Sequence, residues 1–289
     1  MKLLFAIALG AACGAASAQT PAVNRMPDGS RDLYLGLGAL SAPRYEGARE
    51  QRVALLPVLQ LEASNGMFVS GLSAGMHLSS APALEYGPLL ALQPRRSASG
   101  NADGVGGVDS ASRQGLMLVQ QPPDAATRAL PVASRLYGMD TIGARLQVGG
   151  FVNLYLNPHL RLTNELLYGS GNEKKGATWS VAVQHIGADA ALHHSVSLSA
   201  GLTVANRDYQ QAFFGVAPDE AARSGYRAYA AAGGLKDVHI GARWNWALAP
   251  SWMVTSGLRA SRLLGSAQDS PLVERPTNLA VSTALAYRF

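Results

Sequence analysis

Cysteine is almost absent, since Cys13 is the one cysteine among 289 residues. It falls within the predicted leader, so the mature chain would have no disulfides, zinc–thiolate sites or thiol nucleophiles. A lipoprotein signal ending at Cys13 is disfavoured because the leucine usually found three positions upstream is missing. Beyond the leader no run approaches the ~20 apolar residues of a membrane-spanning helix. Yet 48% of residues are hydrophobic, mostly dispersed at alternate positions.

The N-terminus is typical of a secretory leader. Lys2 supplies a positive charge, residues 3–12 are apolar, and Ala16-Ser17-Ala18 fits the small-residue cleavage pattern. We predict cleavage between Ala18 and Gln19. Residues 1–18 would then be a signal peptide, and residues 19–289 would form one exported domain.

Alternation of apolar and polar residues dominates the second half of the chain. From Ser195 to Val204 the even positions are valine, leucine or alanine, and the odd ones serine, glycine or threonine. These runs reach the ~9–11 residues of a tilted membrane strand, whereas strands in ordinary sheets average ~5–6. The pattern predicts an all-β, transmembrane, antiparallel β-barrel whose apolar face meets lipid.

Counting such runs gives eleven candidate strands, at 32–41, 52–62, 66–78, 83–95, 139–156, 160–169, 177–188, 194–206, 233–248, 251–264 and 278–289. Single-chain bacterial barrels have an even number of strands, so we predict twelve, with ten as the alternative. The missing strand is expected within 97–137, at Arg113–Gln121. The rest of 97–137 is predicted to be a long extracellular loop.

Turn residues assign the two ends of the barrel. Short turns at 157–159, 189–193 and 249–250 are predicted to be periplasmic. The longer connections at 169–176, 207–232 and 265–277 are predicted to be extracellular.

Aromatic residues near the predicted strand ends indicate interfacial girdles. Those on lipid-facing positions are Trp179, Trp244, Trp246, Trp252, Tyr287 and Phe289. The last strand ends in Tyr287-Arg288-Phe289, and we expect Tyr287 and Phe289 to act as the signal for the barrel-assembly machinery. The predicted location is the outer membrane.

Chemistry-bearing residues do not form a recognisable catalytic or metal motif. The histidines are scattered over predicted strands and turns: His77, His159, His185, His193, His194 and His239. No predicted external loop combines histidine with an acid and a serine, so we predict no enzyme and no cofactor. The net charge of +5 could suit nucleic acid, but export favours lipopolysaccharide, peptidoglycan or anionic solutes as partners.

Arginines dominate the predicted inward face. The inward positions hold Arg145, Arg161, Arg243, Arg259 and Arg288. An open lumen lined by these side chains would favour anions. Alternatively they pair with acids and fill a narrow barrel.

Several segments together resemble one known family. Residues 207–216, which include Tyr209, Phe213, Phe214 and Gly215, are similar to the MipA/OmpV family of outer-membrane proteins (MltA-interacting protein). Further similar segments follow in the family's order at 224–230, 233–237, 251–252, 262–265, 269–273 (with Asp269, Ser270 and Pro271) and 287–289, with looser agreement at 36–38, 43–47 and 86–88. Residues 97–137 depart from the pattern, being longer and richer in glycine.

The resemblance implies an outer-membrane barrel that acts as a scaffold. It would link a lytic murein transglycosylase to a bifunctional murein synthase, and it brings no catalytic residues. The predicted periplasmic turns are short, and offer little of the ~1,200–2,000 Å² that a stable interface buries. Two hypotheses therefore remain: a murein-enzyme scaffold and an anion-preferring diffusion channel.

Overall fold

The computed structural model describes residues 31–79, 81, 83–101, 135–189 and 193–289. Its long strands are β1 (Arg31–Pro43), β2 (Gln51–Ala63), β5 (Leu84–Gln93), β8 (Arg145–Asn157), β9 (Leu160–Ser170), β10 (Gly176–Asp189), β11 (His194–Ala205), β12 (Gly234–Ala249), β13 (Trp252–Leu263) and β14 (Thr277–Arg288). The short ones are β3 (Met67–Ser70), β4 (Ser73–Met76), β6 (Arg96–Ser97) and β7 (Gly100–Asn101). The helices are α1 (Arg207–Phe214), α2 (Pro218–Ser224) and α3 (Gly265–Gln268).

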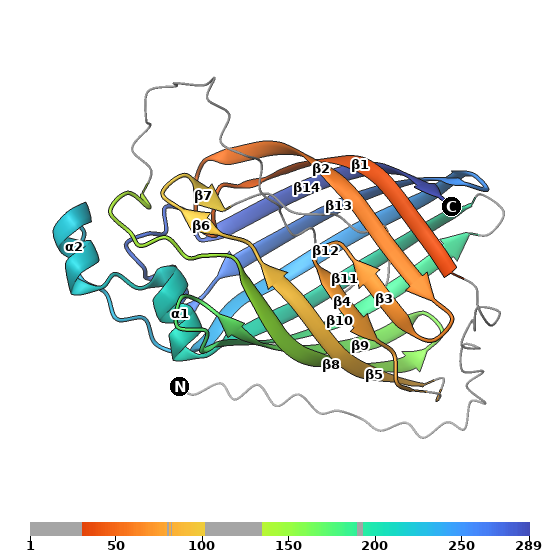
Figure 1. The fold of residues 1–289 in the computed structure, drawn as a ribbon, viewed down its shortest axis with the longest axis horizontal. Coiled ribbons are helices and arrows are strands. Elements are labelled where there is room, and N and C mark those ends of the chain that lie inside the picture. Colours follow the sequence, from red (N-terminus) through yellow and green to blue (C-terminus); the bar gives the residue numbers. More distant parts are fainter. Residues whose placement is uncertain (1–30, 80, 82, 102–134, 190–192) are drawn as a thin grey trace, which may run out of the picture.

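Twelve of the described strands form one closed antiparallel barrel, which confirms the predicted fold and strand number (Figure 1). The ring runs β1-β14-β13-β12-β11-β10-β9-β8-β5-β4-β3-β2. The pair β6 and β7 forms a separate small sheet, and the helices lie in the loops at one end. None of the helices among the described residues is long and apolar enough to cross a membrane.

The last strand closes the barrel by pairing with the first. The register runs from Tyr34 opposite Arg288 to Ser41 opposite Val281. Gly36 allows this close approach, because a Cβ there would overlap the backbone carbonyl of Leu285. Closure leaves no exposed edge between the first and last strands, as a membrane barrel requires.

The twelfth strand does not come from the predicted place. Residues 66–78, predicted as one strand, fold into the β3–β4 hairpin around Gly71-Leu72. Since β5 pairs directly with β8, the barrel has no strand between them, and Arg113–Gln121 lies outside the described residues. A two-residue turn leaves the period of two intact, so alternation alone could not reveal it. Gly71, with φ of +57°, was the available turn signal.

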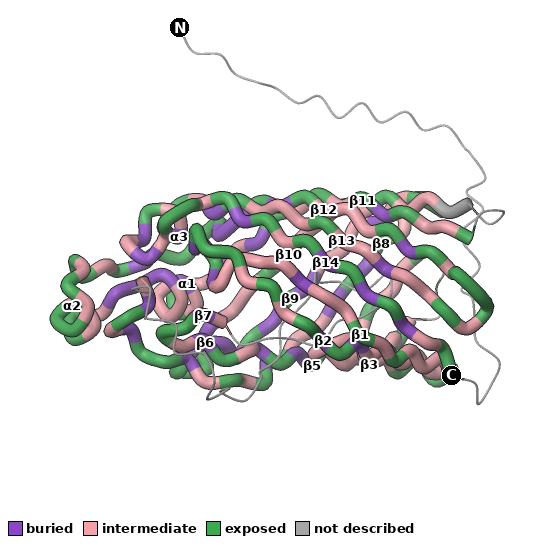
Figure 2. The backbone as a smooth tube through the Cα atoms, turned by 90° about the horizontal axis from the view of Figure 1, so that it is seen from above, coloured by how far each residue is buried: buried purple, intermediate pink, exposed green. Residues whose placement is uncertain are grey.

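Exposure alternates along the strands, as Figure 2 shows. On β11, Val196 and Leu198 are exposed, whereas Ser197 between them is buried in the interior. The predicted strand at 139–156 was wrong at its start. Ile142 is buried and pairs with Arg96, and β8 begins only at Arg145.

Aromatic side chains gather where the last strands end. Tyr287 lies edge-on to Trp252 and to Phe289, with ring centroids 5.0 and 4.9 Å apart. His194 packs against both Trp244 and Trp246 at 5.5 Å. The predicted cleavage site, Ala18 and Gln19, lies outside the described residues.

Candidate functional site

A cavity of about 440 Å³ occupies the interior of the barrel beneath α1. Its described lining includes five basic side chains and three carboxylates: Arg96, Arg161, Lys236, Arg243 and Arg259, with Glu46, Glu165 and Asp237. Hydroxyl and amide groups of β9 to β14 make up much of the remaining wall. The cavity is therefore polar, with an excess of positive charge.

Apolar side chains also face the interior. Leu40, Leu56 and Val58 on β1 and β2 are buried on inward positions. A second cluster on β5, β8 and β9 packs Leu89 and Phe151 against their neighbours. The barrel interior thus combines a basic, polar cavity lining with apolar clusters, and buried polar residues such as Gln60 and Asn153 lie among the latter.

The five arginines predicted to face the lumen divide into two groups. Arg161, Arg243 and Arg259 line the cavity, and the Arg161 Nε donates to Gln184 Oε1 at 2.8 Å. Arg145 and Arg288 are not among its described lining residues. Arg288 is the last residue of β14, and its Nε donates to Asp32 Oδ1 on β1 at 2.9 Å.

Lys236 and Asp237 form a buried ion pair next to α1, and Lys236 also contacts the more exposed Glu46. The β11–β12 register shifts between Thr203 and Val204, which bulges β12 and brings both Lys236 and Asp237 to the interior. Lys236 Nζ lies 2.7 Å from Glu46 Oε1 and 2.9 Å from Asp237 Oδ2. Sequence reasoning missed Lys236 as a lumen residue, because a bulge breaks the alternation used to assign faces.

Helix α1 forms the floor of a cap of loops over this cavity. The Asn206 side chain caps it by accepting from the Tyr209 N–H at 2.9 Å, and Tyr209 stacks on Phe213 at 4.5 Å. Arg96 donates to the last carbonyls of α1, including that of Ala212 at 3.0 Å. Burial lowers the pKa of Arg96 to about 10 and raises that of Tyr209 to about 12.

The family-like segments meet in this cap. Ser270 Oγ donates to the Phe214 carbonyl at 2.6 Å and accepts from the Leu272 N–H at 3.1 Å. The Tyr45 hydroxyl donates to the Leu272 carbonyl at 3.1 Å, and burial raises the pKa of Tyr45. Gly47 N–H donates to Asn278 Oδ1 at 2.8 Å. Segments more than 200 residues apart therefore share one small core.

The remaining predicted motif residues have backbone roles in the cap. The Gly215 N–H ends α1 by donating to the Gln211 carbonyl, and the Pro271 carbonyl accepts from Arg135 Nη1 at 3.0 Å. Asp269 is exposed and ends α3.

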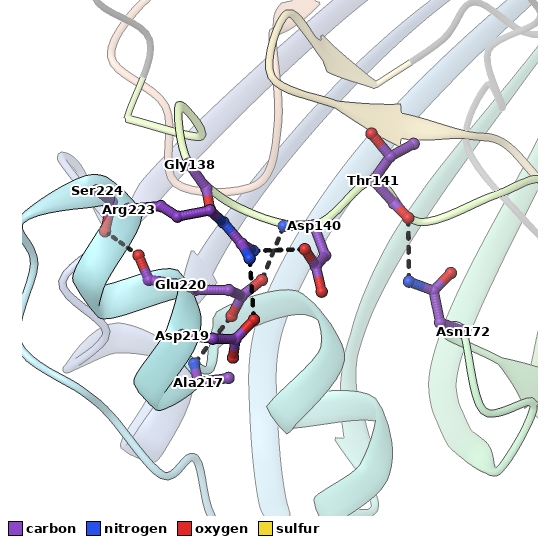
Figure 3. Close-up of polar contacts among 9 residues, drawn as sticks. All are labelled: Gly138, Asp140, Thr141, Asn172, Ala217, Asp219, Glu220, Arg223 and Ser224. Carbon is purple, nitrogen blue, oxygen red and sulfur yellow. Dashed lines mark hydrogen bonds and ion pairs between the residues drawn. The ribbon is translucent and has the colours of Figure 1, made fainter.

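Figure 3 shows the outer edge of the cap, where α2 holds residues 138–140. Arg223 donates to the Gly138 carbonyl at 3.1 Å and also contacts Asp140 and Asp219. Glu220 accepts from the Asp140 N–H at 2.8 Å. Arg223 neutralises two of the carboxylates here, so we assign this cluster a structural role.

Among the described residues, no group of three or more histidine, cysteine, aspartate or glutamate side chains could hold a metal ion. The described histidines fall in separate places, with His77 beside Phe68 and Phe151, and His239 beside Asp237. The groups that line the cavity can bind a solute by charge, hydrogen bonds and apolar contact.

Comparison with known proteins decides the family. The family model described as MltA-interacting protein MipA matches residues 35–289. The chain belongs to the MipA family. As a MipA-family closed barrel, the protein is located in the outer membrane, and both family and fold are of non-enzymatic kinds.

Other comparisons add little beyond the fold. No curated protein matches this MipA-family chain. Solved structures that resemble it include the NanC porin (8% identity, 90% of this chain and 100% of that one, TM-score 0.37). DcaP of Acinetobacter baumannii, an outer-membrane channel, shows 6% identity over 90% and 96% of the chains, with a TM-score of 0.38. The TodX monoaromatic hydrocarbon channel mutant shows 8% identity over 93% and 92%, with a TM-score of 0.39. At these values the likeness carries no argument about function.

Proposed function

We propose that this MipA-family barrel passes small anionic solutes across the outer membrane. The observation that supports this is the interior cavity of about 440 Å³, whose described lining has more basic side chains than carboxylates. A low-dielectric wall strengthens the field of such charges compared with water. An anion that crosses the cavity would then contact the side chains of Arg259, Arg243 and Arg161 in turn.

Conductance in planar bilayers tests this proposal. In a KCl gradient, the reversal potential of the purified barrel should have the sign of chloride preference. Replacing Arg243 and Arg259 together by glutamine should move it towards zero. Arg262→Gln is the matched control, because Arg262 lies on the same strand as Arg259 but is exposed on the outer face. Absence of current, or a cation preference in the unmodified protein, would contradict the proposal.

A scaffold for murein enzymes is the second candidate, favoured by the family description as an MltA-interacting protein. The partners would be a periplasmic murein transglycosylase and a murein synthase. The described turns at the periplasmic end are short, such as the two residues between β8 and β9. An interface there would have to use the barrel rim as well, to approach the ~1,200–2,000 Å² of a stable complex.

Co-purification separates the two candidates. The mature barrel, immobilised in lipid nanodiscs, should retain a purified MltA-type transglycosylase at low salt if the scaffold role holds. An empty-nanodisc column is the control. No retention would count against the scaffold while leaving the conductance result untouched.

Three further expectations concern biogenesis and surroundings. Tyr287 and Phe289 would be read by the barrel-assembly machinery, and lipopolysaccharide would surround the extracellular half. Cleavage after Ala18 would leave Gln19 as the mature N-terminus. Mass spectrometry of the mature protein checks the cleavage site.

A further inference from the structure

Two of the five basic side chains in the cavity lining differ from the others. Arg161 and Lys236 are 2% and 5% exposed, and each has side-chain partners in the barrel wall. Arg96 is also 5% exposed, and it donates to carbonyls of α1. Arg243 and Arg259 are only half-buried, although both line the cavity. These two arginines therefore offer a solute the larger contact surface.

The register places Arg243 and Arg259 on neighbouring strands, each opposite a glycine. Arg259 on β13 pairs with Gly241 on β12, and Arg243 on β12 pairs with Gly257 on β13. The two arginines are thus diagonal neighbours on the inner face, and such positions lie ~7–8 Å apart. Neither glycine contributes a side chain that would separate them. Two flexible side chains that start from these positions can converge on one anion.

Two serine hydroxyls lie beside the arginines. Ser199 on β11 pairs with Gly241, and Ser282 on β14 pairs with Gly257. A Cβ at Gly241 would lie 2.8 Å from the Ser199 Oγ, and a Cβ at Gly257 would lie 2.9 Å from the Ser282 Oγ. Each hydroxyl therefore occupies the space next to its glycine, on the side of the sheet where the arginine beyond that glycine projects.

The six residues form two matching rows on strands that lie side by side in Figure 1. From β11 to β13 one row is Ser199, Gly241 and Arg259, and from β14 to β12 the next row is Ser282, Gly257 and Arg243. An antiparallel strand pair has local two-fold symmetry about an axis perpendicular to the sheet, here between β12 and β13. An anion bound on this axis would meet the same two donors from either side.

Arg259 has no anion in close contact. Among the described residues it makes no hydrogen bond or ion pair, and the carboxylates whose charges reach it belong to Asp237, Glu46 and Glu165. Lys236 already contacts two of these, at 2.9 Å from Asp237 and 2.7 Å from Glu46. A guanidinium that is partly removed from water without an acceptor is unfavourable. An anion at Arg259 would supply acceptors.

Asn278 is a second donor of this kind. It lines the cavity on β14, where it lies diagonal to Arg259, and it is 8% exposed. Its Oδ1 accepts from the Gly47 N–H at 2.8 Å, whereas its Nδ2 has no hydrogen-bond partner among the described residues. A bound solute with a further oxygen atom beside its anionic group would suit this donor.

Charge selects the class of anion. A phosphate monoester carries about −1.5 to −2 charge at pH 7 and three terminal acceptor oxygens, whereas a carboxylate carries one charge and two oxygens. Two guanidinium groups and two hydroxyls therefore match a phosphate better than a carboxylate. Each guanidinium has five N–H donors, so its contacts with other groups still leave donors for the anion.

We propose that Arg243 and Arg259 together bind the phosphate group of a soluble phosphate monoester. Ser199 and Ser282 donate to the same group, and Asn278 donates to the part of the solute esterified to it. As the solute of the channel, this ligand class rests on the proposed function, but binding itself does not require conduction. The position of the site inside the barrel separates it from lipid headgroups.

Calorimetric titration in phosphatidylcholine nanodiscs tests the site, because this lipid is a phosphodiester and contains no phosphate monoester. Glycerol 3-phosphate should bind the unmodified barrel about tenfold or more tightly than glycerate, which keeps two hydroxyl groups but ends in a carboxylate. Equal affinity for the two solutes, or binding of neither, would overturn the proposal.

Substitution of the arginines tests whether they share one anion. Arg243→Gln and Arg259→Gln should each weaken the binding of glycerol 3-phosphate about tenfold or more, because each removes charge-assisted hydrogen bonds. Arg262→Gln, on the outer face of β13, is the control and should leave the affinity unchanged. An effect confined to one of the two inward arginines would overturn the shared site.

Substitution of the serines tests the two-fold arrangement. Ser199→Ala and Ser282→Ala should each weaken binding about two- to tenfold. Ser195→Ala is the matched control, because Ser195 lies on the same strand as Ser199 but outside the described cavity lining. Equal effects of Ser195→Ala and Ser199→Ala would overturn the role assigned to the hydroxyls. The comparison of the two solutes on the unmodified barrel needs no variant to fold.

The outcomes separate this site from the channel. Binding of glycerol 3-phosphate without any chloride current would overturn the channel and leave the site. Chloride current without preferred binding of glycerol 3-phosphate would overturn the site and leave the channel.

Discussion

Replacing Lys236 by methionine should destabilise the barrel strongly. Lys236 and Asp237 are 5% and 3% exposed, so the substitution removes a buried cation and leaves a buried carboxylate behind. Removing one partner of a buried ion pair typically costs ~3–5 kcal/mol. His239 still lies 3.1 Å from Asp237, and Glu46 is itself exposed. We therefore expect the lower end of that range, about 3 kcal/mol.

The assay is urea unfolding of the barrel in lipid vesicles, followed by tryptophan fluorescence. Lys175→Met is the matched control, because Lys175 pairs with Glu173 at 3.1 Å but on an exposed turn. It should leave the unfolding curve unchanged, since exposed ion pairs contribute little. Adding Asp237→Asn to Lys236→Met should restore part of the lost stability, because it removes the uncompensated charge.

Two results would refute this reasoning. Unfolding of Lys236→Met at the same urea concentration as Lys175→Met would mean that the buried cluster contributes nothing to stability. Strict additivity in the double variant would mean that Lys236 and Asp237 do not interact energetically.

Other predictions concern the barrel seam and the cap. Gly36→Ala should impair closure of the seam between β1 and β14, because the new Cβ would overlap the carbonyl of Leu285. The measurement is loss of the heat-modifiable folded band on gels. Gly187→Ala is the control and should fold normally, because the nearest atom to a Cβ there is 3.9 Å away. Ser270→Ala should cost ~1–3 kcal/mol in urea unfolding, because it leaves a buried carbonyl and N–H without their partner. Burial raises the pKa of Tyr209 from its ordinary 10.0 to about 12, so its contribution to cap stability should persist below pH 10 and be lost as pH rises to 12. Titration followed by tyrosinate absorbance should show one component at a pH above that of ordinary tyrosines, and Tyr209→Phe should remove it.

Much of the barrel could be predicted because membrane strands have a local signature. Alternation in 194–206 and 278–289 matches β11 and β14 closely, with the outward and inward faces as expected. The even-number rule gave twelve strands, although eleven runs were visible. It could not say which run contained two strands, because the β3–β4 turn preserves alternation.

The candidate site was harder to predict, because its parts are distant in sequence. Parity placed Arg243 and Arg259 in the interior, but it could not separate them from Arg288, whose neighbour Asp32 is supplied by the strand at the other end of the chain. Lys236 depends on a bulge that no period reveals. The family resemblance pointed to the cap segments without indicating that they pack together.

The sequence by itself determined the class of fold, the membrane-facing side of strands such as β11 and β14, and the family, because these depend on a period of two and on local motifs. Tertiary structure decided which arginines line the cavity, how the loops assemble into a cap and which predicted run divides into two strands. Each of these depends on which strands become neighbours and in what register. Register is set by contacts between residues far apart in the chain, and no local pattern contains it.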